Sequence, residues 1–332
     1  MAPFVVSETE FLPAPLAAGR RAAPNRLRTM MLSRSSKIAL ALATVYLVWG
    51  STYLAIRVGV RDLPPFLFAG ARFVAAGVLM LGWAHWRGRS LPRRGRDWLT
   101  IVVAAVTMLV IGNGLVTWSE QWVESNQAAL IVATSALWIA WFGTLGGRGE
   151  ALDRLTLAGL LLGFGGVAVL VGGGLQLQAA PPLAYLGLLA AAMTWGAGSV
   201  YLRRHALDCS ALVGAALQML VAGLLMGGIG MAGGELSRWT WTADALWALL
   251  YLTLLGSCVA YAAYFWLVQQ VTPAVLGTYA YVNPAVAVLL GWLLLGEWLS
   301  PLQWVGTLVI LAGVALVTLA SRRSNRLRPA TV

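Results

Sequence analysis

Charged residues are scarce in this sequence. They make up 11% of the 332 residues, whereas 59% of the residues are hydrophobic. A typical soluble domain has roughly 25% charged residues, and so few charged side chains cannot cover the surface of a soluble protein of this length. The composition therefore excludes disordered, collagen-like and ordinary cytosolic proteins, and we expect most of the surface to face lipid.

Cysteine and histidine are rarer still, with two residues of each. Cys209 and Cys258 cannot form a disulfide framework or a multi-cysteine metal site, and His85 and His205 are too few for a zinc centre or a histidine-based catalytic site. The ATP-binding pattern GxxxxGK(S/T) is missing from the sequence as well. We therefore expect no cofactor, no metal and no enzymatic activity.

The sequence contains instead a series of ten apolar segments, separated by prolines, glycines or charged residues. One helix needs about 20 apolar residues to cross a bilayer, and the segments are too long and too continuously apolar for barrel strands. We predict an all-α membrane protein with ten transmembrane helices, at residues 38–58, 65–85, 98–118, 127–146, 155–173, 182–202, 210–231, 246–267, 273–295 and 302–320.

Lysine and arginine are distributed unevenly between the predicted loops. With the N-terminus in the cytoplasm, 19 of the 23 Lys and Arg residues fall on the cytoplasmic side, and the outer loops hold only Arg61 and Arg238. Cytoplasmic loops of membrane proteins carry such an excess, so we predict that both termini are cytoplasmic. This distribution explains the net charge of +11 without a nucleic-acid partner.

The two ends of the chain differ from the apolar segments. Residues 1–36 are rich in Ala, Pro and Arg and lack the basic, apolar and cleavage regions of a signal peptide. We predict a disordered cytoplasmic tail there, with Met30 and Met31 as alternatives to Met1 for the true start. Residues 321–332 are predicted to form a basic cytoplasmic tail.

The sequence also contains an internal repeat. At a shift of 146 residues, WGSTYLAIR at 49–57 aligns with WGAGSVYLRR at 195–204. The first half, 37–174, and the second half, 175–320, hold five predicted helices each. Because five is odd, the second half starts on the opposite side of the membrane. The repeat therefore predicts two inverted five-helix halves, an architecture that presents one central site to either side in turn.

Four segments of the chain resemble one known family. They are WGSTYLAIR at 49–57, AGARFVAAG at 69–77, GNGLVTW at 112–118 and YAYVNPAVAVLLGWLLLGEWLS at 279–300. Over about residues 37–320 the chain is similar to the EamA-type carriers of the drug/metabolite transporter superfamily. The resemblance implies a ten-helix carrier of the inner membrane, often an exporter of amino acids, metabolites or drugs, and is closest to inner-membrane exporters with the WGSTY form.

Aromatic and small polar residues accumulate near the middle of the predicted helices. Buried Tyr hydroxyls and Trp N–H groups need hydrogen-bond partners. We predict that these residues line a central substrate cavity suited to amphipathic or aromatic cargo, or to cationic cargo through cation–π contacts; ordinary helix packing is the alternative. The candidates are Trp49, Ser51, Tyr53, Asn113, Thr117, Trp138, Trp195, Ser199, Ser257, Tyr261, Tyr264, Tyr279 and Asn283.

Pro284 lies near the middle of the ninth predicted helix, beside Asn283. A proline inside a helix removes one backbone hydrogen bond and kinks the helix. We predict a kink at the substrate site, and the alternative is a packing kink with an amide hydrogen bond between helices. Members of the family that the chain resembles commonly have a second proline in the fourth helix. This chain has Ser135, Ala136 and Leu137 there, which puts a symmetric pair of proline kinks in doubt.

Few charges fall inside the predicted helices. Arg57 and Arg203 close two of them, where helix C-terminal carbonyls favour cations, and Arg72 lies deeper, where it needs a partner. We predict that these three are structural anchors, with clamps for a substrate carboxylate as the alternative. Glu150 and Glu297 align at a shift of 147 residues and are predicted to be solvated end caps or loop contacts.

Together these features predict a secondary-active or facilitative transporter that moves small organic solutes by alternating access. The family resemblance alone implies export rather than uptake. Proton-driven carriers usually need a titratable group in the membrane core, and the nearest carboxylate is Glu120, just past the third predicted helix. Facilitated movement or exchange therefore fits at least as well as proton coupling. A channel or scaffold without alternating access and a membrane-embedded enzyme are the alternatives. The expected partners are the lipid bilayer and a small-molecule substrate; the oligomeric state is left open.

Overall fold

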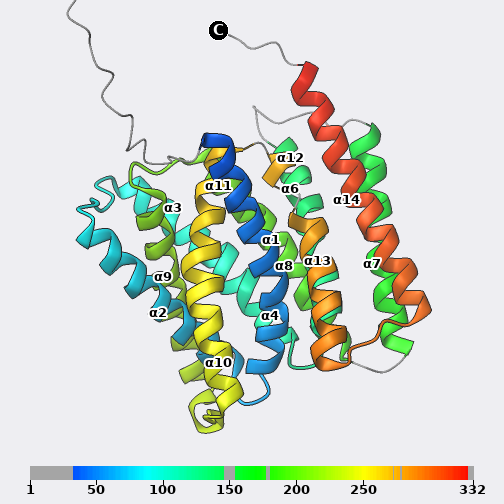
Figure 1. Cartoon of the computed structure of the whole chain (residues 1–332), viewed down its shortest axis with the longest axis horizontal. Coiled ribbons are helices and arrows are strands. Elements are labelled where there is room, and N and C mark those ends of the chain that lie inside the picture. The colour runs from blue at the N-terminus through cyan, green and yellow to red at the C-terminus, as the bar shows by residue number, and fades with distance from the viewer. Residues whose placement is uncertain (1–32, 146–153, 177–179, 272, 277–278, 328–332) are drawn as a thin grey trace, which may run out of the picture.

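The computed structural model describes residues 33–145, 154–176, 180–271, 273–276 and 279–327. All regular structure in these residues is helical and none is a strand, which confirms the predicted all-α class (Figure 1). Seven helices are long and apolar enough to cross a membrane, and three shorter apolar helices lie at 157–166, 282–295 and 304–313. Helices therefore occupy all ten predicted apolar segments, and the number of membrane crossings stays a prediction.

The first half contains five helical stretches, two of them composite. They are α1 (Arg34–Gly59), α2 (Pro65–Trp86), the stretch Gly95–Ser119 built from α3 (Gly95–Ala104), the π-helix η1 (Ala105–Asn113) and α4 (Gly114–Ser119), then the pair α5 (Ser125–Val132) and α6 (Ser135–Thr144), and α7 (Arg154–Gln176).

The second half repeats this order. Its stretches are α8 (Pro182–Arg204), α9 (Ala211–Ala232), the stretch Ala243–Gln270 built from α10 (Ala243–Tyr251), the π-helix η3 (Leu252–Tyr261) and α11 (Ala262–Gln270), then α12 (Pro273–Leu276), α13 (Tyr279–Leu290) and the π-helix η4 (Gly291–Leu295), and α14 (Pro301–Leu327). A short 3-10 helix, η2 (Glu235–Arg238), links α9 to α10.

Equivalent helices of the two halves pack against each other in antiparallel pairs. In the pair α2/α9, a Cβ atom built on Gly77 would lie 2.9 Å from the Ala216 carbonyl oxygen, and one built on Gly223 would lie 2.9 Å from the Gly70 carbonyl oxygen. These two contacts are related by the 146-residue shift of the repeat. The backbones therefore approach closely through glycine, as small residues allow in membrane helices, and the two contacts obey a local two-fold axis.

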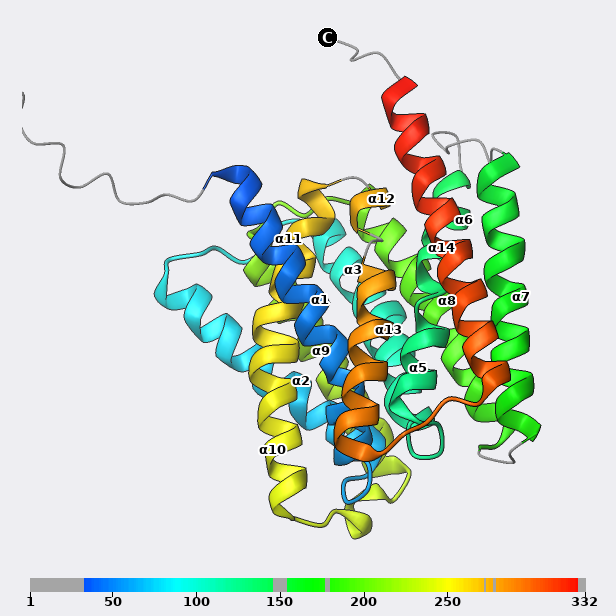
Figure 2. The same cartoon turned by 45° about the vertical axis from the view of Figure 1, so that its right-hand side comes forward.

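The pair α7/α14 repeats this arrangement at one edge of the bundle, where the two helices lie side by side (Figures 1 and 2). A Cβ on Gly166 would lie 2.6 Å from the amide nitrogen of Ile310, and a Cβ on Gly313 would lie 2.5 Å from that of Gly163. The shift relating these contacts is 147 residues. The two pairs flank the remaining helices, and the start of α1 and the end of α14 lie at the same end of the bundle.

The outer surface of the bundle is strongly apolar. Leu47, Leu161, Leu224 and Leu308 are between 62% and 68% exposed, and many other large apolar side chains share this surface. Large exposed apolar areas on a helical bundle indicate a lipid or protein partner. With helices of bilayer-spanning length, the partner here is the lipid bilayer.

Several predicted boundaries differ from the structure. The chain becomes helical at Arg34, inside the predicted N-terminal tail, because the Ser33 hydroxyl accepts a hydrogen bond from the Ser36 amide at 3.1 Å and caps the helix. At the other end, α14 continues to Leu327, into the residues predicted as the basic C-terminal tail. Its last turns are rich in arginine, which forms helices well and is favoured near a helix C-terminus.

Two departures from regular α-helix have the same place in both halves. The π-helical segments η1 and η3 start at Ala105 and Leu252, which are 147 residues apart. Such segments are rare and often occur at functional sites.

The fourth helical stretch of the first half is also interrupted, between Val132 and Ser135, although it has no proline. There the Thr134 hydroxyl donates to the Ile131 carbonyl at 2.6 Å, a local bond that competes with the helix ladder.

Candidate functional site

A small cavity lies between the two halves, at the middle of the bundle. Its volume is about 70 Å³, well below the roughly 300–1,000 Å³ of a drug-sized ligand pocket. The π-helices η1 and η3 both contribute to its wall. Seven of the predicted cavity residues line it, namely Trp49, Tyr53, Asn113, Trp195, Tyr261, Tyr279 and Asn283.

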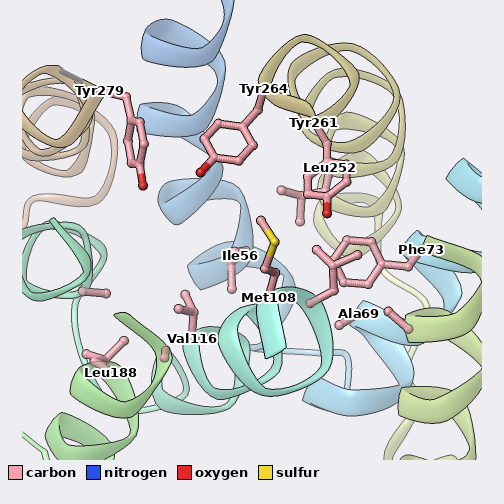
Figure 3. Packing of buried hydrophobic residues seen from close by; sticks show 14 of the residues in the cluster. Ile56, Ala69, Phe73, Met108, Val116, Leu188, Leu252, Tyr261, Tyr264 and Tyr279 are labelled. Carbon is pink, nitrogen blue, oxygen red and sulfur yellow. The ribbon is translucent and has the colours of Figure 1, made fainter. Parts of the chain in front are cut away.

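Aromatic rings from four helical stretches meet beside this cavity. The Trp49 ring lies 4.8 Å from the Tyr264 ring, 5.4 Å from the Trp195 ring and 5.8 Å from the Tyr279 ring. Figure 3 shows Tyr264 and Tyr279 side by side in the interior of the bundle, where their ring centres lie 5.8 Å apart. The indole N–H of Trp49 donates to the Gly256 carbonyl oxygen at 3.2 Å, so the ring is held at a fixed angle.

Each of the three tyrosine hydroxyls has a hydrogen-bond partner. The Tyr261 hydroxyl donates to the Gln218 side-chain oxygen at 2.5 Å. The Tyr264 hydroxyl lies 2.9 Å from the Ser199 hydroxyl, and the Tyr279 hydroxyl lies 3.1 Å from the Ser135 hydroxyl. Buried polar groups are expected to be satisfied in this way. These bonds orient the rings before any substrate arrives.

Asn283 borders the cavity and also ties two helices together. With its amide nitrogen turned toward them, the side chain donates to the backbone oxygens of Tyr46 at 3.1 Å and Tyr279 at 3.2 Å. The next residue, Pro284, is buried and faces a separate groove lined by Trp292 and Trp298. Helix α13 continues through Pro284, so the proline does not end the helix. Because Pro284 faces the separate groove, it does not line the central cavity.

The other predicted cavity residues lie outside the cavity wall. The hydroxyls of Ser51 and Thr117 donate to backbone oxygens of their own helices, and Ser51 also contacts the Tyr251 hydroxyl. Trp138 packs on Phe142 and Phe164. The remaining three stand behind the wall. Ser257 contacts the wall residue Arg72, Tyr264 contacts the wall residue Trp49, and Ser199 bonds to the Tyr264 hydroxyl and to the backbone oxygen of Trp195. The sequence predicted where each of these residues lies along its helix, but it did not predict in which direction the side chain points.

The three predicted structural arginines fall into two kinds of place. Arg57 donates to the Glu120 carbonyl oxygen, and Arg203 donates to the Val271 carbonyl oxygen at 2.9 Å, so each ties one helix end to a neighbouring stretch. Arg72 instead lines the cavity. Its position is 5% exposed.

The two predicted end-cap glutamates also differ. Glu297 is buried and not solvated; it accepts hydrogen bonds from the Ser125 amide at 3.0 Å, the Ser125 hydroxyl at 2.7 Å and the Asn126 amide at 3.2 Å. It is therefore a loop contact that caps the start of α5, where a carboxylate is favoured. Glu150 lies outside the described residues.

Glu120 is a buried carboxyl that the sequence did not reveal. It follows the last residue of α4, is 0% exposed, and its two side-chain oxygens accept no hydrogen bond from the described residues. Burial raises the pKa of the Glu120 carboxyl well above its usual range, and the Glu297 carboxylate raises it further, against the opposing effects of Arg57 and Arg72. The carboxyl therefore favours its neutral form.

Sequence reasoning did not name two residues that contribute to the site, Ser135, which lines the cavity, and Gln218, which holds the Tyr261 hydroxyl. Arg72 lines the cavity as well, although the sequence favoured a structural anchor and kept a clamp for a substrate carboxylate as the alternative. Arg72 and Gln218 occupy equivalent positions of the repeat at a shift of 146 residues. A polar residue at the same interior position of both halves was the available signal. Among the described residues, no three His, Cys, Asp or Glu side chains group in a way that would hold a metal.

Comparison with known proteins agrees with this architecture. The sequence profile described as "EamA-like transporter family" matches residues 36–172 and 182–319, once in each half. The chain belongs to the EamA-like transporter family. The resemblance of the four sequence motifs is thereby confirmed, and the double match agrees with the repeat of the helices.

Relatives of this EamA-like transporter cover nearly all of its helices. It is 41% identical over 280 residues to the "Uncharacterized inner membrane transporter YedA" of Escherichia coli strain K12, spanning 84% of this chain and 90% of that protein. It is 25% identical over 287 residues to an "Uncharacterized transporter" of Archaeoglobus fulgidus, spanning 86% and 98%. A solved crystal structure is similar with a TM-score of 0.66 and 26% identity, spanning 88% and 99%.

Proposed function

We propose that this EamA-like transporter is a secondary carrier that moves small organic solutes across the inner membrane by alternating access. The observation that carries the proposal is the position of the cavity, whose walls come from both halves of an inverted repeat. Trp49 and Asn113 come from the first half, and Trp195 and Tyr261 come from the second. A central site at a repeat interface is typical of alternating-access carriers.

The packing supports a rocking movement of the halves. In the pairs α2/α9 and α7/α14, glycines bring the backbones of the two halves into close contact. The cavity is small in this conformation, so admission of cargo requires the helices around it to separate. Opening at one end at a time then exposes the same aromatic wall to either side of ten membrane-crossing helices, with both termini in the cytoplasm.

The cavity wall indicates the kind of cargo. Trp49, Tyr53, Trp195 and Tyr261 offer large rings, and Asn113 and Ser135 add a few polar groups. Such a wall suits small solutes with an apolar or aromatic body, among which amino acids, metabolites and amphipathic drugs are the candidates. The printed name of the E. coli relative, an inner membrane transporter, supports the location, and the family resemblance supports export.

Reconstitution tests the carrier mechanism. Purified protein is first screened by thermal shift against amino acids, polyamines and amphipathic drugs, and the best ligand is then assayed for counterflow in proteoliposomes. A carrier gives saturable uptake that is accelerated by unlabelled ligand on the other side; flux without counterflow contradicts the proposal and favours a channel. Trp49→Ala should abolish most of this uptake, whereas Trp83→Ala, at a position 53% exposed on the outer surface, should not.

Topology is tested separately. In a background without Cys209 and Cys258, single cysteines are placed at Glu150 and at Trp298, which is 72% exposed. Impermeant thiol reagents should label the two positions from opposite sides of the membrane. Labelling from the same side contradicts the inverted arrangement.

A further inference from the structure

Arg72 carries a positive charge into the wall of the central cavity. The residue lies on α2, is 5% exposed and borders the same space as Trp49 and Tyr261. The two ion pairs within 4.0 Å among the described residues, Arg94–Asp208 and Arg238–Glu235, lie elsewhere. The Arg72 guanidinium therefore has no carboxylate in contact with it.

The guanidinium is held in place from one side only. Its Nε donates to the Ser257 hydroxyl at 2.8 Å, and its Cζ lies 4.8 Å from the centre of the Phe73 ring. Gly256 adds no side chain at this point, and a Cβ built there would lie 3.2 Å from an Arg72 terminal nitrogen. Of the five N–H donors of a guanidinium, the hydrogen bonds within the described residues use only the one on Nε.

A buried cation without a contacting anion is costly unless another group satisfies it. The charge of Glu120 acts on Arg72, but among the described residues Glu120 forms no ion pair within 4.0 Å, and its carboxyl favours the neutral form. The terminal nitrogens of Arg72 match a carboxylate, because the guanidinium fork binds two oxygens at once. The surrounding rings of Trp49, Tyr53 and Tyr261 match an apolar body.

We propose that Arg72 binds the carboxylate of the transported solute, so that the cargo is a small organic acid, or a zwitterion, with an aromatic or apolar body. This inference rests on the proposed function of the central cavity. It also narrows the cargo, since a positive charge in the wall repels the cations that the aromatic rings would otherwise attract. The equivalent position in the second half is Gln218, so the carboxylate has one subsite and not two.

A matched set of four ligands tests the charge preference. The probes are phenylpropanoate, phenylpropanol, phenylpropylamine and phenylalanine, which share one ring and differ in charge. Calorimetry on the purified full-length protein should show phenylpropanoate binding at least about tenfold more tightly than phenylpropanol, with phenylpropylamine the weakest. Equal binding of the acid and the alcohol, or no binding of either carboxylate, overturns the proposal. Phenylalanine shows whether the amino group is tolerated.

Variants then assign the preference to Arg72. R72Q should bring phenylpropanoate down to the affinity of phenylpropanol, whereas Arg61→Gln, which removes an exposed arginine, should change nothing. Because R72Q could fail to fold, Ser257→Asp is the second variant: it places an internal carboxylate beside Arg72 and should also abolish the preference for the acid. A preference for the acid that survives in either folded variant overturns the proposal.

The two proposals fail in different ways. Selective binding of phenylpropanoate without counterflow in proteoliposomes contradicts the carrier mechanism and leaves the carboxylate subsite standing. Counterflow of ligands with no dependence on the carboxylate or on Arg72 contradicts the subsite and leaves the carrier standing.

Discussion

The two halves of the molecule are alike in their scaffold and unlike in their site. Gly77 and Gly223 make equivalent backbone contacts in the pair α2/α9, and Gly166 and Gly313 do so in α7/α14. The π-helices η1 and η3 also correspond. These shared features are backbone features, and the proposed rocking of the two halves would use them in the same way on either side.

The chemistry of the site does not follow this symmetry. Arg72 corresponds to Gln218 in the second half, and Asn283 corresponds to Ala136 in the first. The movement of a carrier has to be reversible, and this favours matching halves, whereas one substrate has one orientation and needs each recognition group only once. The comparison teaches that symmetry identifies the moving parts and that asymmetry identifies the binding groups.

The largest effect is expected from filling the glycine contacts. Gly223→Leu and Gly77→Leu should each cost more than about 3 kcal/mol, above the usual range for overpacking, because a Cβ would lie 2.6 Å from the Val74 amide nitrogen in one case and 2.7 Å from Leu220 Cγ in the other. The measurement is the fraction of monodisperse protein after detergent extraction, together with its unfolding temperature. Gly82→Leu, where no atom lies within 4 Å, is the control. A loss confined to one member of the pair would break the symmetry of the scaffold.

The next effect concerns the cap of α5. Glu297→Ala removes three accepted hydrogen bonds and should destabilise the protein by about 3 kcal/mol, measured by thermal or denaturant unfolding. Glu150→Ala, at the equivalent place of the first half, sharpens the comparison: an equal loss would extend the symmetry to this contact. Unchanged stability of Glu297→Ala would contradict the capping role.

A smaller effect of opposite sign is expected at Glu120, which corresponds to Leu267 in the second half. Glu120→Gln should raise the unfolding temperature by about 2–4 °C near neutral pH, since the folded protein either holds this carboxyl in its neutral form or buries a charge that accepts no hydrogen bond from the described residues. Because burial raises the pKa of Glu120, the wild type is most stable below the ordinary carboxyl pKa and loses stability as pH rises through the raised value.

Unfolding temperatures measured over a series of pH values test whether the wild type loses stability as pH rises. The advantage of Glu120→Gln over the wild type should grow as pH rises and vanish in acid. Glu124→Gln is the comparison variant, because that carboxyl is partly exposed and accepts a hydrogen bond from the Gln127 side chain at 3.2 Å. A difference between Glu120→Gln and the wild type that shrinks with rising pH would show that Glu120 is stabilised in its charged form.

The smallest effect is expected behind the cavity wall. Ser199→Ala removes the partner of the Tyr264 hydroxyl and should cost about 1 kcal/mol. Thr117 occupies the place equivalent to Tyr264, and Thr117→Val removes only a bond within one helix, so its cost should be smaller. Thermal unfolding of the two variants, side by side, tests whether this hydroxyl bond belongs to one half alone.

The sequence predicted the helices and the repeat because both follow from local composition and spacing. Apolar runs and glycine–proline breaks place a helix within a few residues, and Trp49 and Trp195 mark the shift of the repeat. Side-chain direction was harder, since a mid-helix position does not tell which neighbour it faces. Trp138 is an example: it was predicted to line the cavity, but its ring packs against Phe142 and Phe164.

Other features depend on contacts between distant parts of the chain. The sequence placed Glu120 just past the third predicted helix, but it does not tell that the folded chain buries this residue completely. The absence of a proline put a kink in the fourth predicted helix in doubt, yet the helix breaks there, where the Thr134 hydroxyl bonds to the Ile131 carbonyl oxygen. The π-helices carry no composition signal, since their extra residue per turn depends on packing.

The indole of Trp49 finds its acceptor in the main chain, at the carbonyl of Gly256 within η3. An acceptor built from the peptide unit is present whatever amino acid occupies that position. Relatives that change every side chain around this space to suit other compounds would keep an oxygen at the same point, so specificity can diverge while the anchoring of this ring is inherited unchanged.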